Sequence, residues 1–374
     1  MNEANCLMIL NLDDIHWDSL FPPSSDGVDL ATFTQLHAAK SILVTGAGGS
    51  IGAALVRAMT ALNPGQLVLV DSSEQNLYSI HKQLSSQSMH HVPVLGSVAD
   101  ERCMRDIFVR FRPQIVYHAA ALKHVPLSEM NPFAVIENNV FGTATLDDLA
   151  SEYGLERLVM VSTDKSVAPE SIMGASKRLA EMMLQTRKEE HRHVTSIRLG
   201  NVLGSEGSVV LLFLEQIARG GPITVTDPNV ERYFITMDST VLRVLAAAAD
   251  CPAHPSIAIP VLGNPVKISD LARFLIAESR AKNIQITYTG LRPGDKLREK
   301  FVAPGESVSH ETRNLLQWVG GPHLAVSHLA PGLAELRAAV KHRNLGQLLF
   351  ALMDLVPEYL PSAYLREHMS GTVS

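Results

Sequence analysis

The 374-residue chain has little cysteine and no long apolar run. Its three cysteines, Cys6, Cys103 and Cys251, lie far apart and fit neither a disulfide framework nor a metal-binding spacing. No metal site is therefore expected, and the thiols are expected to be reduced. The longest apolar run near the start, Cys6–Leu10, is too short for a signal peptide or a bilayer span. These absences predict a soluble, cytoplasmic protein with no membrane span.

A strong excess of one charge is also absent. The formal net charge is -6 at pH 7, and lysines and arginines are spread along the chain. Because no basic stripe is present, the sequence does not predict nucleic-acid binding. An anionic ligand would depend on cations placed locally inside a pocket.

Short apolar segments alternate with helical patterns from about Lys40 to residue 200. The strand-like segments are residues 42–44, 67–70, 92–95, 115–117, 158–161 and 194–197. The amphipathic segments between and after them are residues 51–62, 75–84, 101–111, 133–153 and 172–188. This alternation predicts an α/β fold, a doubly wound Rossmann-type parallel sheet with helices on both faces.

The rhythm changes after residue 200, where helical patterns (209–219, 239–249 and 268–281) accompany two short strands (223–225 and 284–286). We expect a smaller α/β domain at the carboxyl edge of the sheet, with a ligand cleft between the two. The predicted division is an N-terminal extension (1–39), the Rossmann domain (40–200), the smaller domain (mainly 201–329) and C-terminal helices (330–374, with helices at 333–341 and 345–355).

Glycines mark the junction of the first strand and the first helix. Gly46, Gly49 and Gly52 form the pattern Gly-x-x-Gly-x-x-Gly within Thr45–Gly52. Such glycines permit a tight turn, let backbone approach a pyrophosphate and let helix and strand pack closely, while the helix N-terminus attracts the anion. The segment predicts a dinucleotide-binding loop.

An acidic residue, Asp71, ends the second strand about 20 residues after the last of these glycines. A carboxylate there accepts hydrogen bonds from an adenosine ribose and repels a 2′-phosphate, which favours NAD. Ser72 and Ser73 leave NADP open as an alternative.

Chemically reactive side chains follow the fifth strand, in Ser162-Thr163-Asp164-Lys165. The next helix carries Met173 and Lys177, which share one helix face because they are four residues apart. In a doubly wound fold both segments border the nicotinamide, so they predict a catalytic site.

These motifs resemble the extended short-chain dehydrogenase/reductases, and within them the CapD-type UDP-N-acetylglucosamine 4,6-dehydratases of polysaccharide biosynthesis. The resemblance covers about residues 40 to 300. The stretches that carry it are Ala119–Pro126, Ser162–Lys165, Met173–Arg178, Arg198–Val209 and Gly290–Leu297, besides the glycine loop.

The resemblance implies oxidation of sugar C4 by NAD⁺, loss of the C5 proton, departure of the C6 hydroxyl and return of the hydride to C6, so that a tightly bound cofactor is recycled. Lys165 would take the C5 proton, a role that requires a neutral amine, and Asp164 would protonate the leaving hydroxyl. Thr163 would bind the C4 oxygen, and Lys177 the nicotinamide ribose.

Met173 departs from the family pattern, which has tyrosine as the base for the C4 hydroxyl. A thioether cannot accept that proton. A membrane-anchored branch of the CapD-type proteins shares the methionine. The base is then Asp164, Lys177 acting through a water, or Lys165. Ser97 also replaces an aspartate that contacts adenine in relatives, and Asp295 replaces the usual glutamate.

The resemblance extends to the remaining contacts. The expected cofactor-binding residues are Gly46, Gly48, Gly49, Ser50, Ile51, Gly52, Asp71, Ser72, Ser97, Val98, Ala119, Ala120, Ala121 and Lys177. The expected substrate-binding residues, mainly in a nucleotide-sugar-binding domain at 201–329, are Lys123, His124, Asn201, Gly204, Ser208, Val209, Thr224, Thr226, Arg232, Arg292 and Asp295.

The resulting hypothesis is a 4,6-dehydratase of UDP-N-acetylglucosamine for surface polysaccharide or glycan synthesis, with inversion at C5 left open. A homo-oligomer is expected from the resemblance. Two alternatives stay open: a UDP-sugar 4-epimerase, which needs no Asp-Lys pair, and a catalytically impaired NAD-binding regulatory protein, which Met173 and Ser97 would fit.

Overall fold

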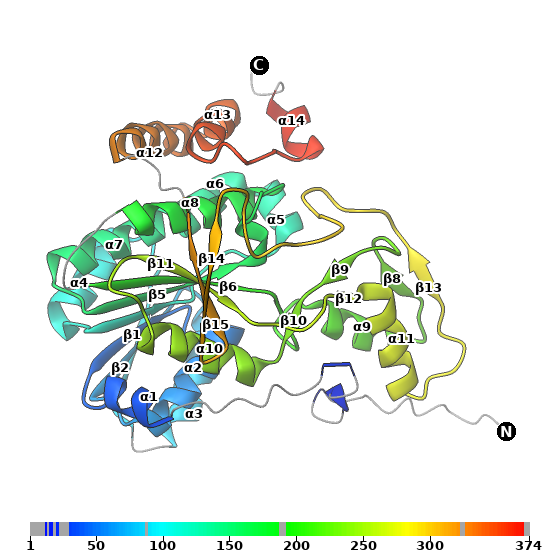
Figure 1. Cartoon of the computed structure of the whole chain (residues 1–374), viewed down its shortest axis with the longest axis horizontal. Coiled ribbons are helices and arrows are strands. Elements are labelled where there is room, and N and C mark those ends of the chain that lie inside the picture. Colours follow the sequence, from blue (N-terminus) through cyan, green and yellow to red (C-terminus); the bar gives the residue numbers. More distant parts are fainter. Residues whose placement is uncertain are drawn as a thin grey trace.

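A nine-stranded sheet forms the centre of the computed structural model (Figure 1). The structure describes residues 12, 15–17, 20–21, 30–86, 89–186, 192–321 and 326–369. The strand order is β14-β15-β11-β6-β5-β4-β1-β2-β3, and the strands from β11 to β3 are mutually parallel. This order, which reverses between β1 and β4, confirms the predicted doubly wound parallel sheet.

The first six strands lie where the apolar segments predict them. Their bounds are β1 Ser41–Thr45, β2 Gln66–Asp71, β3 His91–Leu95, β4 Ile115–His118, β5 Arg157–Thr163 and β6 His193–Leu199. Alternate residues of β1 enter different cores: Ile42 and Val44 face one side of the sheet, and Leu43 faces the other. Apolar residues therefore run without interruption along a strand that is covered on both faces.

Helices cover both faces of the sheet. One face packs against α1 Leu30–His37, α2 Ser50–Met59 with a 3₁₀ turn at Thr60–Leu62, α3 Glu74–Ser85 and α10 Met237–Ala249. The other packs against α4 Glu101–Phe111, α7 Gly142–Glu152 and α8 Ile172–Thr186. The helix expected at 133–153 is present as α6 Pro132–Ile136, a π turn at Glu137–Phe141 and α7.

Three further strands join the sheet from beyond residue 200, which the sequence pattern did not reveal. They are β11 Ser256–Pro260, β14 Ser307–Arg313 and β15 Leu316–Gly320. β14 is polar and largely exposed at the sheet edge, so it carries no apolar pattern. The sheet is thus completed by residues from the range assigned mainly to the smaller domain.

A second lobe lies beside the carboxyl ends of the strands (Figure 1). It contains α9 Val209–Ala218 and α11 Ile268–Glu278 around the pair β8 Ile223–Val225 and β13 Ile286–Tyr288. Two small strand pairs complete it: β7 Asn201–Val202 with β10 Phe234–Ile235, and β9 Glu231–Arg232 with β12 Val266–Lys267. The predicted strand at 284–286 begins at residue 286 instead.

The described part of the predicted N-terminal extension is residues 12, 15–17, 20–21 and 30–39, which include α1, and Cys6 falls outside it. The described residues Trp17 and Phe21 pack onto the second lobe, with ring centroids 5.8 Å from Phe274 and 5.5 Å from Phe234 respectively. Cys103 and Cys251 are free thiols.

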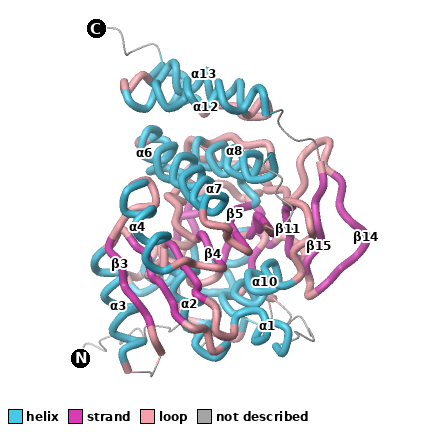
Figure 2. Tube along the Cα trace, turned by 90° about the vertical axis from the view of Figure 1, so that its left-hand side faces the viewer, coloured by secondary structure: helices cyan, strands magenta, loops and turns pink. Residues whose placement is uncertain are grey.

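The C-terminal helices form an additional layer over α6 and α8 (Figure 2). They are α12 Val326–Lys341, α13 Leu345–Leu355 and α14 Ala363–Met369. The first two overlap the predicted helices, whereas α14 was not anticipated. Their leucines share one apolar core with Ile136, Ile172 and Leu179. Within the described residues, no helix is both long and apolar enough to cross a bilayer.

Candidate active site

A cavity of about 340 Å³ lies between the carboxyl ends of the strands and the second lobe. It brings together residues that the sequence places more than a hundred positions apart. The predicted site residues that line it are Ile51, Ala119, Ala121, Lys123, His124, Thr163, Lys165, Met173, Lys177, Asn201, Ser208, Val209, Arg232, Arg292 and Asp295.

Other predicted site residues do not line this cavity. They are Gly46, Gly48, Gly49, Ser50, Gly52, Asp71, Ser72, Ser97, Val98, Ala120, Asp164, Gly204, Thr224 and Thr226. Thr224 instead exchanges hydrogen bonds with the Gln216 amide, and the Leu12 side chain lies against Gly204. Val98 is buried against Gly142. For all of the predicted site residues outside the cavity, contact with a ligand stays a prediction.

The glycine loop has the backbone that its sequence predicts. Gly46 has φ +65°, and a Cβ there would lie 2.7 Å from the backbone nitrogen of Ala120. At Gly52 a Cβ would lie 2.0 Å from the Gly46 carbonyl oxygen. Helix α2 begins directly after, at Ser50. A side chain at either position would clash with backbone, so the turn requires glycine there, and it lies in front of a helix N-terminus, where an anion can bind.

Asp71 is hydrogen-bonded to this loop. Its carboxylate accepts hydrogen bonds from the N–H groups of Gly48 and Ser73, both at 2.9 Å. The acidic group therefore stands beside the glycine turn, where an adenosine ribose would lie. Loop and carboxylate together fit a dinucleotide.

The Asp164–Lys165 pair lies at the carboxyl end of β5, where the strand passes into a 3₁₀ turn, Asp164–Ser166. The Lys165 ammonium donates to Asp164 Oδ1 at 3.0 Å and to Asn201 Oδ1 at 3.2 Å. Asp164 is fully buried, and its Oδ2 has no hydrogen-bond partner among the described residues. Burial raises the pKa of Asp164 against the opposing effect of Lys165. A protonated Asp164 can donate a proton.

A second buried carboxylate, Glu299, was missed by the sequence analysis. Its Oε1 lies 3.7 Å from the Lys165 ammonium, and its Oε2 lies 3.2 Å from that of Lys296. Burial alone would raise the pKa of Glu299, but the charges of Lys165, Lys296 and Arg232 outweigh it and lower the pKa. Lys165 is therefore flanked by two carboxyl groups whose pKa values are shifted in opposite directions. The only sequence signal for Glu299 was its position, two residues after the Gly290–Leu297 motif.

Met173 and Lys177 lie on one face of α8 and both line the cavity, as their spacing predicts. Burial lowers the pKa of Lys177 to about 8, so the neutral amine is accessible near physiological pH. His118, the last residue of β4, hydrogen-bonds with Thr45 and Thr143. Burial, and next the charge of Lys177, lowers the pKa of His118 to about 3, so this ring stays neutral.

Further cations line the cavity. The buried Arg232 guanidinium donates to the backbone carbonyls of Glu231, Lys296 and Leu297. Arg292 is exposed and pairs with Asp295 at 2.8 Å. Lys123 donates to the Glu206 carbonyl at 2.8 Å. Arg232 is already engaged by backbone, so Arg292 and Lys123 are better placed to meet an anionic ligand.

The chain is similar to proteins of known kinds. Residues 42–318 match the family described as polysaccharide biosynthesis protein. The chain is 40% identical over 307 residues to the capsular polysaccharide biosynthesis protein CapD of Staphylococcus aureus, which covers 80% of this chain and 51% of CapD. It therefore spans about half the length of that relative.

Two further likenesses concern dehydratases. The chain is 30% identical over 288 residues to an inverting UDP-N-acetylglucosamine 4,6-dehydratase of Campylobacter jejuni, which covers 74% of this chain and 81% of that protein. Its fold is similar to that of DesIV, a dTDP-glucose 4,6-dehydratase of Streptomyces venezuelae solved with NAD bound. That match has a TM-score of 0.60 at 22% identity and covers 69% of this chain and 87% of DesIV.

Proposed function

Because the chain belongs to the polysaccharide biosynthesis protein family, we propose that it is an NAD-dependent 4,6-dehydratase acting on UDP-N-acetylglucosamine. The observation that carries this proposal is the Asp164–Lys165 pair, whose lysine lines the cavity. Elimination of water needs an acid and a base in addition to the base for the C4 hydroxyl, whereas epimerisation at C4 does not need this second pair. The relative from Campylobacter jejuni, an inverting UDP-N-acetylglucosamine 4,6-dehydratase, supports the choice of sugar.

The choice of NAD rests on Asp71. Its carboxylate is held beside the glycine turn by two backbone N–H groups, so a 2′-phosphate at this place would meet a fixed negative charge. Bound NAD would accept a hydride from the sugar and return it, and would be retained between turnovers. Lys177 is placed to hold the nicotinamide ribose.

The side chains divide the proton transfers between them. Lys165 takes the proton from C5, and Asp164, whose pKa burial raises, donates to the departing C6 hydroxyl. Glu299 carries the negative charge of the cluster. For the C4 hydroxyl, Lys177 acting through a water is the best-supported base, since Met173 lacks a basic atom and the pKa of Lys177 is lowered to about 8.

The test is the product formed by the purified protein from UDP-N-acetylglucosamine in D₂O, followed by NMR. We expect a 4-keto-6-deoxy sugar with deuterium at C5. The Lys165→Met variant should lose at least about a hundredfold in kcat, because a positioned general base contributes that much. Lys300→Met, at an exposed lysine that follows Glu299 in the sequence, is the matched control and should keep wild-type activity.

Other products would identify the alternatives. A product that retains its 6-hydroxyl and differs only at C4 would indicate an epimerase. If several UDP-hexosamines yield neither a product nor an NADH signal, the dehydratase proposal is wrong and a regulatory protein is favoured.

A further inference from the structure

Residues 358–362, here named the C-terminal strap, lie in the connection between α13 and α14. Tyr359, Pro361 and Ser362 are buried, and no strap residue lines the active-site cavity. The strap nevertheless contacts, directly or through one or two side chains, both ends and the middle of the segment 163–177. That segment carries Lys165 at one end and Met173 with Lys177 at the other.

The middle contact is made by backbone. The Leu360 N–H donates to the Pro169 carbonyl at 3.0 Å. On the opposite side, the Lys296 ammonium donates to the Val167 carbonyl at 2.8 Å. Ala168 between them has φ +42°, a conformation that residues with a Cβ rarely adopt and that persists only where the surroundings hold it. The loop is therefore held in its shape from both sides.

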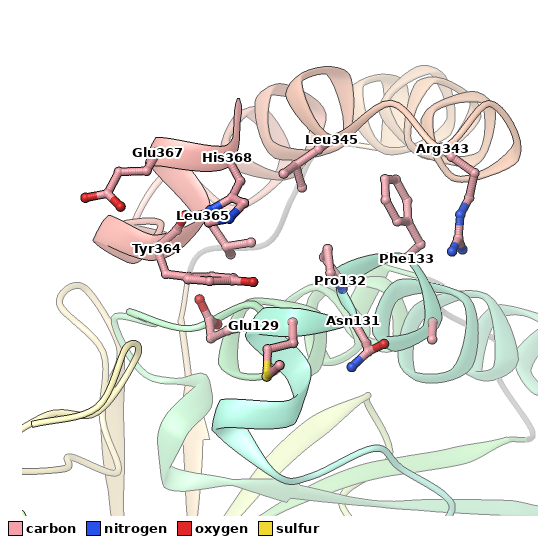
Figure 3. Close-up of a pocket in the computed structure, with 12 residues that line it drawn as sticks. Glu129, Asn131, Pro132, Phe133, Arg343, Leu345, Tyr364, Leu365, Glu367 and His368 are labelled. Atoms are coloured by element: carbon pink, nitrogen blue, oxygen red, sulfur yellow. Dashed lines mark hydrogen bonds between the residues drawn. The ribbon is translucent and has the colours of Figure 1, made fainter. Parts of the chain in front are cut away.

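The second contact reaches the start of α8. Ser362 Oγ donates to one carboxylate oxygen of the buried Glu129, and the other oxygen accepts the Ile172 N–H at 2.8 Å. Figure 3 shows Glu129 facing Tyr364 and Leu365 of α14 across a pocket of about 420 Å³. Glu129 belongs to α5 Val125–Met130, so one carboxylate ties the strap to the first residue of the helix that carries Met173 and Lys177.

The third contact reaches the other end of the segment through buried charges. Glu358 pairs with Arg178 at 2.7 Å, and Arg178 also pairs with Glu181. Glu181 Oε1 accepts hydrogen bonds from Ser162 at 2.6 Å and Ser166 at 2.8 Å, the residues on either side of Thr163–Lys165. Arg178 and Glu181 are almost wholly buried, so their bonds are shielded from water.

We propose that the C-terminal strap is a positioning element that fixes the Asp164–Lys165 turn relative to the Met173–Lys177 face of α8. A base and a cofactor-holding lysine must keep their spacing within a fraction of an ångström for proton and hydride transfers on one sugar. The helix already packs closely here, since a Cβ at Gly174 would lie 2.3 Å from the Lys165 carbonyl oxygen. The strap restricts the motion of the loop that connects the Asp164–Lys165 turn to α8.

Amide hydrogen exchange followed by mass spectrometry tests this inference without any turnover. In Ser362→Ala and in Glu358→Gln, peptides from 163–177 should exchange about tenfold faster, because each change removes a bond to a buried charged group. Strand β6 should exchange as in the wild type. Glu367→Gln, an exposed glutamate on α14, is the matched control and should change nothing. Unchanged exchange in 163–177, or faster exchange confined to 326–369, would overturn the proposal.

Kinetics add a second readout, which rests on the proposed dehydratase function. In the two strap variants kcat should fall roughly tenfold with KM within twofold, since the strap does not touch the cavity. Ser362→Thr should keep kcat near the wild-type value, because the threonine hydroxyl can replace the serine hydroxyl as donor. An equal loss in the Glu367→Gln control would contradict a specific positioning role. If the wild type dehydrates no UDP-sugar, the dehydratase proposal fails while the exchange experiment still decides on the strap.

Discussion

The cofactor loop and the acid–base cluster lie at the carboxyl ends of β1 and β5, on either side of β4, but are built in different ways. The loop Gly46–Gly52 is specified by local backbone demands, with a positive φ at Gly46 and close approaches that exclude a Cβ. The cluster around Lys165 is assembled from three distant segments, which supply Asp164, Asn201 and Glu299. A local motif can therefore be read from sequence, whereas a site made by burial and long-range charge depends on the complete fold.

The largest effect of a single substitution is expected at the glycine loop. In Gly52→Ala, the added Cβ must displace the Gly46 carbonyl, at a cost of about 1–3 kcal/mol. NAD affinity measured by calorimetry should fall roughly ten- to a hundredfold. Gly263→Ala is the control, because a Cβ there meets nothing within 4 Å. Wild-type NAD affinity in Gly52→Ala would show that the loop does not bind the dinucleotide.

The acid–base cluster should respond to charge rather than shape. Glu299 raises the pKa of Asp164 through its negative charge, so Glu299→Gln should lower it. Dehydration that needs a protonated Asp164 is lost as pH rises, and the alkaline limb of the kcat profile should move to lower pH. A roughly tenfold fall in kcat is expected near neutral pH, with NAD affinity unchanged. Glu311→Gln, at an exposed position, should leave the profile in place.

The third expected effect concerns stability in mild acid rather than activity. The folded-state pKa of His118 is about 3, below its ordinary value of 6.5, so the neutral ring stabilises the fold above pH 6.5. That contribution is lost as pH falls below 6.5, at about 1.4 kcal/mol per pH unit. Urea unfolding of His118→Gln between pH 7 and 5 should therefore show a shallower loss of stability than the wild type. Parallel slopes for the two proteins would contradict the buried, neutral assignment.

The ion pair of Glu306 contributes to stability in a more acidic range. Burial alone would raise the pKa of Glu306, but its hydrogen bonds and ion pair with Arg198 hold that pKa at about 2. Its contribution is present above its ordinary pKa near 4.5 and is lost only as pH falls towards 2. Unfolding measured between pH 7 and 5 therefore reports on the neutral His118 and leaves the ion pair of Glu306 intact.

Sequence reasoning succeeded where periodicity and steric rules act locally. It placed β1 to β6, the glycine turn and the shared face of Met173 and Lys177. It missed β14, whose exposed polar residues give no strand pattern, and α14, which is short.

The same limit explains the missed site residue. Glu299 is a glutamate in a charged stretch, Arg298-Glu299-Lys300, which in isolation is typical of a solvated surface. Only the folded chain shows that it is buried beside Lys165 and Lys296. The cation Arg232 shows the converse: its residue type predicts anion binding, but three of its five N–H donors already bind backbone carbonyls.

One hydrogen bond between the two ligand regions has a thermodynamic consequence. The Glu206 N–H donates to Ser50 Oγ at 2.9 Å, which joins the loop 204–208 of the second lobe to the first residue of α2. A ligand that strengthens or breaks this link from one side changes the affinity on the other side by the same factor, since binding free energies are reciprocal. Sugar nucleotide and dinucleotide would then bind cooperatively, and the sign of that coupling would tell whether the bond closes or opens when both are held.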